Sequence, residues 1–313
     1  MPLPPLIRYV LKRLLFLIPI LLGISIVAFT ILHLTPGDPV TVWIGTDPNT
    51  SPEAIQRLRT ELGLDDPVYV QYIKFLERAI HGDFGRNIRT NRPVLLDVAE
   101  TLPRTLLLTF SSIGVAIVIG IPIGIYAATH RNSIFDNVSM VGSLFAASVP
   151  NFWLALILIL AFSYYLGLTP IGGYGEPKHL ILPSLCLGTI LAGALARFTR
   201  SNMLEVIRQD YVRAARAKGL DGRTVVYRHA LRNALIPILT VLGLQIGSLL
   251  SGSFFVETVF AWPGIGRLAI QAVQERNYAV VQASLLVTSV TFVIINLVVD
   301  ILYAYIDPRV QYE

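Results

Sequence analysis

The chain has 313 residues, of which 54% are hydrophobic and only 14% are charged, and its mean hydropathy is +0.63. Soluble domains carry about a quarter charged residues, so this composition excludes an ordinary soluble protein and indicates an integral membrane protein. The single cysteine, Cys186, excludes an intrachain disulfide and a cysteine metal cluster, and the net charge of +5 comes mostly from short basic segments beside apolar runs, which is typical of membrane orientation rather than nucleic-acid binding.

The first membrane-spanning helix is predicted at Leu14 to Leu32, a run of 19 residues without a charge. Such a run is long enough to cross about 30 Å of hydrocarbon. Arg8, Lys12 and Arg13 precede it, so the N-terminus is expected in the cytoplasm. A cleaved signal peptide is the alternative, but the run is too long and no small-residue cleavage site follows it. Residues 1–32 are therefore predicted to form a cytoplasmic end and a first span.

Residues 33–101 are predicted to form an external helical subdomain, because ten acidic and seven basic residues give them a soluble character. One helix is expected to begin at Ser51-Pro52 and to end at Gly63, since proline favours the first turn of a helix and glycine its end. A second helix is expected to begin after Pro67 and to run to Gly82. Asp83-Phe84-Gly85 is predicted to be a turn.

The remainder is predicted to hold five further spans, which makes a core of residues 102–306 and an all-α membrane protein with six transmembrane helices. Residues 197–232 contain nine Lys or Arg against three acids and are expected to form a cytoplasmic loop. A tail, residues 307–313, is expected in the cytoplasm as well. Gly120 and Gly124 have the spacing that lets helices approach closely. The five spans are predicted at Thr105–Thr129, Asn137–Leu166 with a break at Pro150-Asn151, Leu180–Ala196, Asn233–Val256 and Tyr278–Val299.

Several kinds of chemistry are missing from the sequence. No lysine follows a glycine, so there is no phosphate-binding Gly-Lys loop; no His-Glu-x-x-His zinc motif and no Gly-x-Ser-x-Gly elbow occur either. Charged residues are almost absent from the predicted spans, which leaves little for a proton or ion relay. We therefore expect a chain that is not an enzyme, binds no cofactor or metal itself and takes its energy from a partner.

The basic stretch from Asp210 to Gly219 is predicted to be a short helix that docks onto another protein. Asp210 is expected to cap the helix, and Gly219 is expected to end it in the left-handed conformation. At helical spacing Tyr211 shares a side with Ala214, Ala215 and Lys218, whereas Arg213 and Arg216 point elsewhere. The alternative is a solvated basic loop held near anionic lipid.

Two uncharged amides within the spans, Asn151 and Gln245, are candidates for the translocation path. A polar side chain at membrane depth needs other helices or a water-filled path around it. A bond to a neighbouring helix is the alternative for both residues.

Several motifs resemble binding-protein-dependent ABC importer permeases of the dipeptide, oligopeptide and nickel branch. Arg213-Ala-Ala-Arg-Ala-Lys-Gly219 is similar to the family's Glu-Ala-Ala-x-x-x-Gly loop, although arginine replaces the glutamate. Ile236-Pro237 also differs in register from the general family's Ile-x-Leu-Pro. The wider run Tyr211 to Pro237, the segment Glu257 to Arg267, His33 to Pro39 and His81 to Gly85 match the branch, so the resemblance extends over essentially the whole chain.

The resemblance implies a type I importer permease in a bacterial inner membrane. Its expected partners are a second permease, two cytoplasmic ATPases that use ATP and Mg²⁺, and an external peptide-binding protein. The residues implied to couple the chain to the ATPases are Asp210, Tyr211, Arg213, Ala214, Ala215, Arg216, Lys218, Gly219, Leu220 and Asp221. A nickel or glutathione permease of the same branch remains an alternative, and so does a channel or secondary carrier that works alone.

Overall fold

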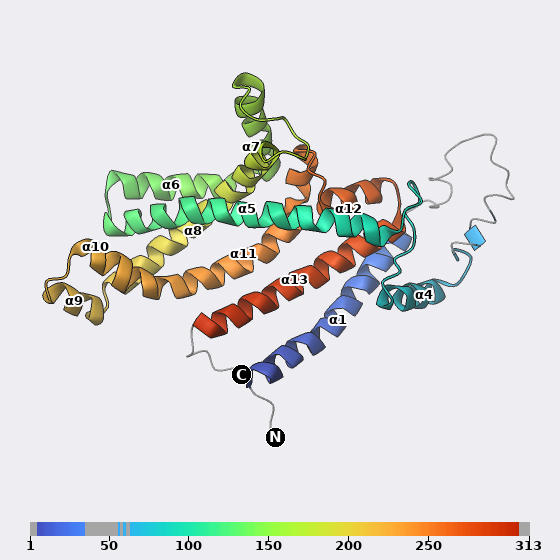
Figure 1. Ribbon diagram of the computed structural model, residues 1–313, viewed down its shortest axis with the longest axis horizontal. Coiled ribbons are helices and arrows are strands. Elements are labelled where there is room, and N and C mark those ends of the chain that lie inside the picture. Colours follow the sequence, from blue (N-terminus) through green and yellow to red (C-terminus); the bar gives the residue numbers. More distant parts are fainter. Residues whose placement is uncertain (1–4, 35–55, 57–58, 61–62, 307–313) are drawn as a thin grey trace. The chain divides into compact units, whose positions relative to one another are not determined.

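The computed structural model describes residues 5–34, 56, 59–60 and 63–306. This part of the chain is helical and has no β-strand; it contains one isolated bridge, between Arg86 and Pro93. The helices, which include two π-helical segments labelled η, are α1 (Pro5–Leu34), α4 (Val68–Ile80), α5 (Val94–Thr129), α6 (Ile134–Ser148), α7 (Asn151–Leu158), η1 (Ile159–Tyr165), α8 (Lys178–Ile207), α9 (Asp210–Ala217), α10 (Gly222–Thr224), η2 (Val225–Ala230), α11 (Leu231–Val259), α12 (Ile265–Gln274) and α13 (Tyr278–Ile306) (Figure 1).

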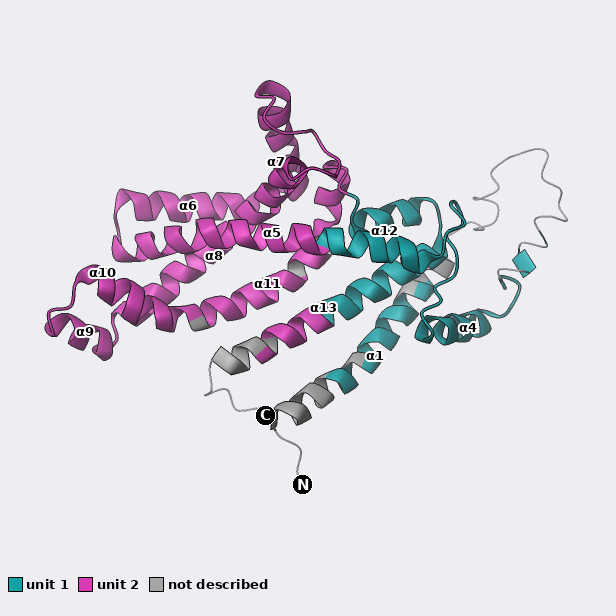
Figure 2. Ribbon diagram, viewed as in Figure 1, with its two compact units in different colours: residues 1–105, 263–293 teal, residues 106–262, 294–313 magenta. Residues whose placement is uncertain are grey.

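The chain divides into two compact units (Figure 2), residues 1–105 with 263–293 and residues 106–262 with 294–313. Of the three boundaries between the units, two fall inside continuous helices, so α5 and α13 contribute to each unit, and the third lies between α11 and α12. The predicted external subdomain, residues 33–101, and membrane core, residues 102–306, are defined by whether water or lipid surrounds them and not by compactness. This division stays a prediction.

In the first unit, α4 packs against α1 through aromatic side chains. The ring of Phe29 lies 5.3 Å from that of Tyr72 and 6.4 Å from that of Phe75. The hydroxyl groups of Ser25 and Tyr72 are 2.8 Å apart. A second apolar cluster joins the start of α5 to α12 and α13, and its buried members are Val94, Val98, Ile265, Ala272, Val280, Val281 and Ala283.

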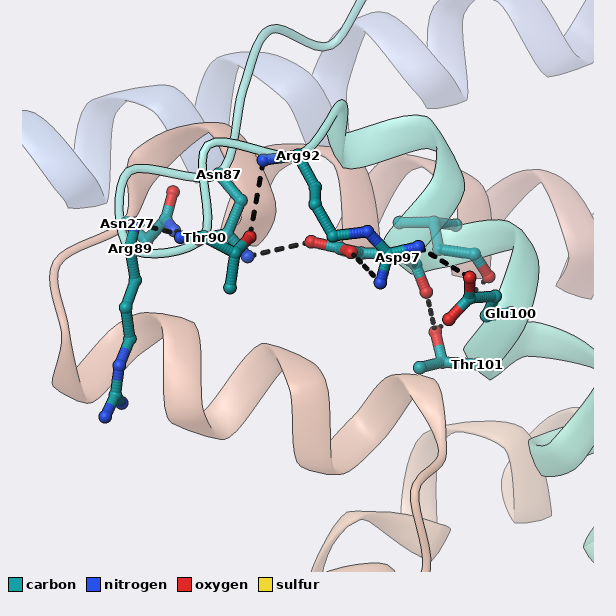
Figure 3. A network of polar contacts seen from close by, with 9 residues as sticks. Asn87, Arg89, Thr90, Arg92, Asp97, Glu100, Thr101 and Asn277 are labelled. Carbon is teal, nitrogen blue, oxygen red and sulfur yellow. Dashed lines mark hydrogen bonds and ion pairs between the residues drawn. The ribbon is translucent and has the colours of Figure 1, made fainter.

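A polar network fastens the loop before α5 to the start of α13 (Figure 3). The Asn87 amide donates to the Asp97 carboxylate at 2.8 Å, and Asn277 donates to the side-chain oxygen of Asn87 at 2.9 Å. At its exposed edge Arg92 pairs with Glu100 at 2.6 Å. These bonds satisfy polar groups that would be costly to bury alone, so the network supports the local fold.

In the second unit, α8 is the central helix and packs against α6, α7 and α11. Small residues allow α5 to approach it closely, as predicted for Gly120 and Gly124. A Cβ atom on Gly120 would lie 2.7 Å from the carbonyl oxygen of Ala192, and one on Gly124 would lie 2.6 Å from that of Ala196. Both distances are shorter than van der Waals contact, so glycine is required at these two positions.

All six predicted spans coincide with helices. In the described part of the chain, α5, α8 and Tyr278–Val299 of α13 are each long and apolar enough to cross a membrane. Two bent pairs raise this number to five if each is one span: Ile134–Ser148 with Asn151–Tyr165, and Gly222–Leu235 with Pro237–Gly247. In α1 the apolar stretch Leu14–Val27 is shorter. How many of these helices cross the bilayer stays a prediction.

The predicted break in the third span is confirmed. Helix α6 ends at Ser148, and the chain resumes as a helix at Asn151 after a bend of 105°. The cause is local, because Pro150 has no backbone N–H to continue the α6 hydrogen-bond pattern.

Other boundaries differ from the predicted ones. Helix α5 begins at Val94, well before Thr105, and α12 lies between the predicted fifth and sixth spans. Most of the first external helix lies outside the described residues, but Gly63 has the left-handed φ of +67° expected at its end. The second external helix is confirmed as α4, and the turn after it is confirmed by a bond of 2.9 Å from the Gly85 N–H to the Asp83 carboxylate.

Candidate functional site

The predicted docking helix exists as α9 and lies in a hairpin between two long helices. Helix α8 continues beyond the predicted span to Ile207, and α9 follows over Asp210–Ala217. The chain then passes through α10 and η2 directly into α11. Residues 197–232 are thus largely helical rather than an open loop.

Gly219 ends α9, as predicted. It has a φ of +80°, its N–H donates to the carbonyl of Arg216 at 2.9 Å, and the Leu220 N–H donates to the carbonyl of Ala215 at 3.4 Å. These two bonds form a Schellman motif, which satisfies carbonyl groups that the end of a helix leaves without partners. The geometry depends on a residue that tolerates positive φ.

The predicted capping role of Asp210 is wrong. The N-cap residue is Gln209, whose side chain makes no capping hydrogen bond, and Asp210 is the first residue of the helix. Its carboxylate instead pairs with Arg213 at 3.0 Å, and both side chains are largely exposed. In the first turn an acidic group still interacts favourably with the helix dipole. Arg213, which replaces the family's glutamate, therefore has a local partner.

The buried side of α9 is different from the predicted one. Val212 is fully buried and Ala215 is 7% exposed, and both pack against Val225 of η2 with Val206 of α8 beside them. Ala215 therefore faces the protein's own interior rather than a partner, because the flanking segments supply an apolar surface for it. The prediction that it shares an accessible side with Ala214 is wrong.

The outer side of α9 remains accessible. Tyr211 is 44% exposed, and Ala214 and Lys218 are exposed at positions one and two turns further along the helix. Arg213 and Arg216 are exposed as well, and so is Leu220 after the helix. We call Tyr211, Ala214 and Lys218 the outer face of α9. It offers an aromatic ring, a small residue and a cation in one row.

At α10 and η2 lies an open pocket of about 380 Å³ that sequence reasoning missed, apart from Asp221. Asp221 caps α10 by accepting from the Arg223 N–H at 3.1 Å. Residues 228–232 lie within the run from Tyr211 to Pro237 that resembles the family. The pocket is lined by Asp221, Arg223, Thr224, Tyr227 and Arg228.

The two amides predicted on the translocation path lie on different helices of the second unit. Asn151 is the first residue of α7, is half-buried, and accepts a hydrogen bond at its backbone carbonyl from the Cys186 thiol at 3.4 Å. Gln245 lies half-buried in α11, against which α7 packs. Neither residue lines the pocket at Asp221, so their role stays a prediction.

Two family models match the chain. The model described as "Binding-protein-dependent transport system inner membrane component" matches residues 120–312, which include α9 and the pocket at α10 and η2. The model described as "Binding-prot-dependent transport system membrane comp, N-term" matches residues 6–109.

Individual relatives match over nearly the full length. The dipeptide transport system permease protein DppB of Alkalihalophilus pseudofirmus is 44% identical, and the alignment covers 98% of this chain and 100% of that one. The glutathione transport system permease protein GsiC of Escherichia coli (strain K12) is 45% identical with the same coverage.

Among solved structures, the inward-facing MetNI methionine ABC transporter has a chain with a TM-score of 0.59 and 22% identity, over 68% of this chain and 97% of that one. An amino acid ABC transporter has a TM-score of 0.51 and 18% identity, over 68% of this chain and 94% of that one. These similarities concern the fold, which is that of an ABC importer permease. From the family models, the full-length relatives and the helical fold it follows that the chain belongs to the binding-protein-dependent transport system inner membrane components and is a multi-pass inner-membrane permease subunit of an ABC importer.

Proposed function

We propose that this permease imports short peptides. The dipeptide and glutathione permeases are almost equally similar to it and share its full length. Glutathione is itself a short peptide, so the substrates named for both relatives have amide groups and charged ends in common. Import of nickel is the alternative within the branch.

The chain is proposed to work as one subunit of a larger complex. A second permease completes the membrane part, two ATPases bind from the cytoplasm, and an external binding protein delivers the peptide. ATP and Mg²⁺ are used by the ATPases and not by this chain, which has no phosphate-binding Gly-Lys loop. The excess of Lys and Arg in residues 197–232 supports a cytoplasmic position for this segment and for both termini.

The ATPases are proposed to bind at the outer face of α9. The single observation that supports this best is the asymmetry of α9: Val212 and Ala215 are buried within the protein, while Tyr211, Ala214 and Lys218 stay accessible. An isolated helix of this length is marginal in water, so its inner contacts and its Schellman end are needed to hold the outer face in place. Asn151 and Gln245 are proposed to face the peptide as it passes.

The experiment is transport by the complete complex in proteoliposomes. The permease, its sister permease, the ATPases and the binding protein are reconstituted, and ATP-driven uptake of a labelled dipeptide, of glutathione and of Ni²⁺ is compared. Uptake of a peptide with peptide-stimulated ATP hydrolysis is the expected result. Uptake of Ni²⁺ alone would favour the nickel alternative, and uptake by this chain without the ATPases would favour a carrier that works alone.

A further inference from the structure

An ion pair with a buried carboxylate joins the first turn of α6 to α8, near the C-terminal end of that helix. Asp136, in the first turn of α6, is 1% exposed. Its two carboxylate oxygens accept from the guanidinium of Arg200, from Nε at 2.5 Å and from Nη2 at 2.7 Å. This bidentate arrangement fixes both the distance and the orientation of the two groups, which a single contact between charges does not.

The same carboxylate also holds the turn itself. The backbone N–H of Asn132 donates to it at 2.9 Å, and the Asp136 N–H donates to the Ser133 hydroxyl, which caps α6, at 3.1 Å. Asn132 has a φ of +62°, which is uncommon for a residue other than glycine. The Asp136 carboxylate thus binds both the turn, through Asn132, and α8, through Arg200.

From Arg200 the contacts lead to α9. Arg200 and Val206 lie on one helix and are separated by about 9 Å along its axis, at 1.5 Å per residue. Val206 is part of the apolar cluster that carries Val212 and Ala215. A displacement of α9 therefore acts on the end of α8 that Arg200 connects to α6.

From Asp136 the contacts lead to the break in the third span. Helix α6 lies along α8, since Arg197 donates to the Ser143 carbonyl at 3.2 Å and a Cβ on Gly193 would lie 3.0 Å from the same oxygen. Its far end is Ser148, directly before the 105° bend at Pro150 and the start of α7 at Asn151. One end of α6 is fixed by the ion pair, and the other end meets the bend.

We infer that Asp136 and Arg200 are positioning residues that pass the movement of α9 to α6 and so to the bend at Pro150. The inference rests on the proposed docking of the ATPases at α9. A buried ion pair is weak evidence for a role in stability, because apolar residues can replace such a pair without loss of stability. What the pair supplies is a fixed geometry between two helices, and fixed geometry is what transmission of a movement requires.

The test is the number of peptide molecules imported per ATP hydrolysed, measured on the reconstituted complex for wild type and Asp136→Asn. The amide keeps an oxygen for the Asn132 N–H but loses the bidentate pair, and Arg200, with 24% of its side chain exposed, can reach water. We expect bound ATPases and continuing ATP hydrolysis, with at least about a fivefold fall in peptide per ATP, the lower range of measured couplings between sites. Arg200→Lys keeps the charge but cannot donate two parallel hydrogen bonds. Its ratio of peptide imported to ATP hydrolysed should lie between those of wild type and Asp136→Asn.

Arg131→Gln is the matched control, because it removes an exposed cation from the same turn and should leave the ratio unchanged. The double variant Asp136→Asn/Arg200→Gln removes both charges and serves if the single variant does not assemble; it should be uncoupled to the same degree. An unchanged ratio in the double variant, or a parallel loss of ATPase binding, hydrolysis and transport, would overturn the inference. Failure of wild-type permease to bind ATPases would instead overturn the proposed docking at α9.

Discussion

Val212 of α9 and Val225 of η2 are both buried and pack against each other, so the hairpin that carries the proposed docking helix has a small apolar core of its own. This contact decides which side of α9 a partner can reach. Of two neighbouring alanines, Ala214 is exposed and Ala215 is buried. They provide a direct test of the docking surface.

Ala214→Asp is expected to abolish ATPase binding while the hairpin stays folded, because the new carboxylate lies on the exposed outer face. Ala215→Asp is expected to unfold the hairpin, because it buries an unpaired charge among valines at a cost on the order of 3 kcal/mol. Copurification of the ATPases and limited proteolysis of residues 197–232 measure the two effects. Normal ATPase binding by Ala214→Asp would show that the outer face is not the docking surface.

Gly219→Val is expected to weaken ATPase binding through the backbone alone. A Cβ at Gly219 would meet no atom within 4 Å, but its φ of +80° is strained for a β-branched residue by about 1–3 kcal/mol. Gly219→Asn should be milder, because asparagine tolerates the left-handed region. Gly222→Ala is the control, since that glycine has open space and no positive φ. Copurification of the ATPases measures the effect, and equal copurification with all three variants would refute this role for Gly219.

Gly124→Ala is expected to lower the free energy of unfolding of the permease by about 1–3 kcal/mol, the usual cost of overpacking. Its Cβ would lie 2.6 Å from the Ala196 carbonyl oxygen and 2.6 Å from the Cβ of Thr199, so α5 and α8 must separate. Gly114→Ala in the same helix meets nothing within 4 Å and serves as the control. A thermal unfolding curve in detergent measures both, and identical midpoints would contradict the close approach of α5 and α8.

The topology is tested by labelling single cysteines with a thiol reagent that does not cross membranes. Cys186 is buried and is first replaced by serine. Cysteines at the exposed positions Glu176 and Gln274 are expected to react from outside, and one at exposed Asp221 only after the membrane is opened. Reaction of the Asp221 position in intact cells would reverse the predicted orientation.

Asn151→Leu and Gln245→Leu are expected to lower peptide uptake while the complex still assembles. Each change removes an amide from a half-buried position, at a cost to stability of about 1 kcal/mol if the amide only bonds a neighbouring helix. Peptide uptake and copurification of the ATPases are both measured, so that a loss of transport is distinguished from a loss of assembly. Wild-type uptake by both variants would assign the two amides a structural role.

The sequence by itself determined the features that depend on neighbouring residues. Charge-free runs indicated where long helices lie, because a segment crosses the bilayer only if it carries few charges, and these can be counted without the fold. Gly219 and Pro150 marked the end of α9 and the break before α7, because their effects come from the residue's own backbone. The start of α5 was missed because Asp97, Glu100 and Pro103 give its first turns the composition of a loop.

The tertiary structure decided which faces are buried and which distant groups meet. The inward position of Ala215 depends on Val206 and Val225, which reach α9 from the segments before and after it. Helix α12 was not predicted, although its ten residues are amphipathic, and its apolar side packs with the start of α5 and with α13. Asp136 and Arg200 are 64 positions apart, and no periodicity or motif joins them. Their pairing exists only because α6 and α8 pack side by side and leave the carboxylate no water to bind.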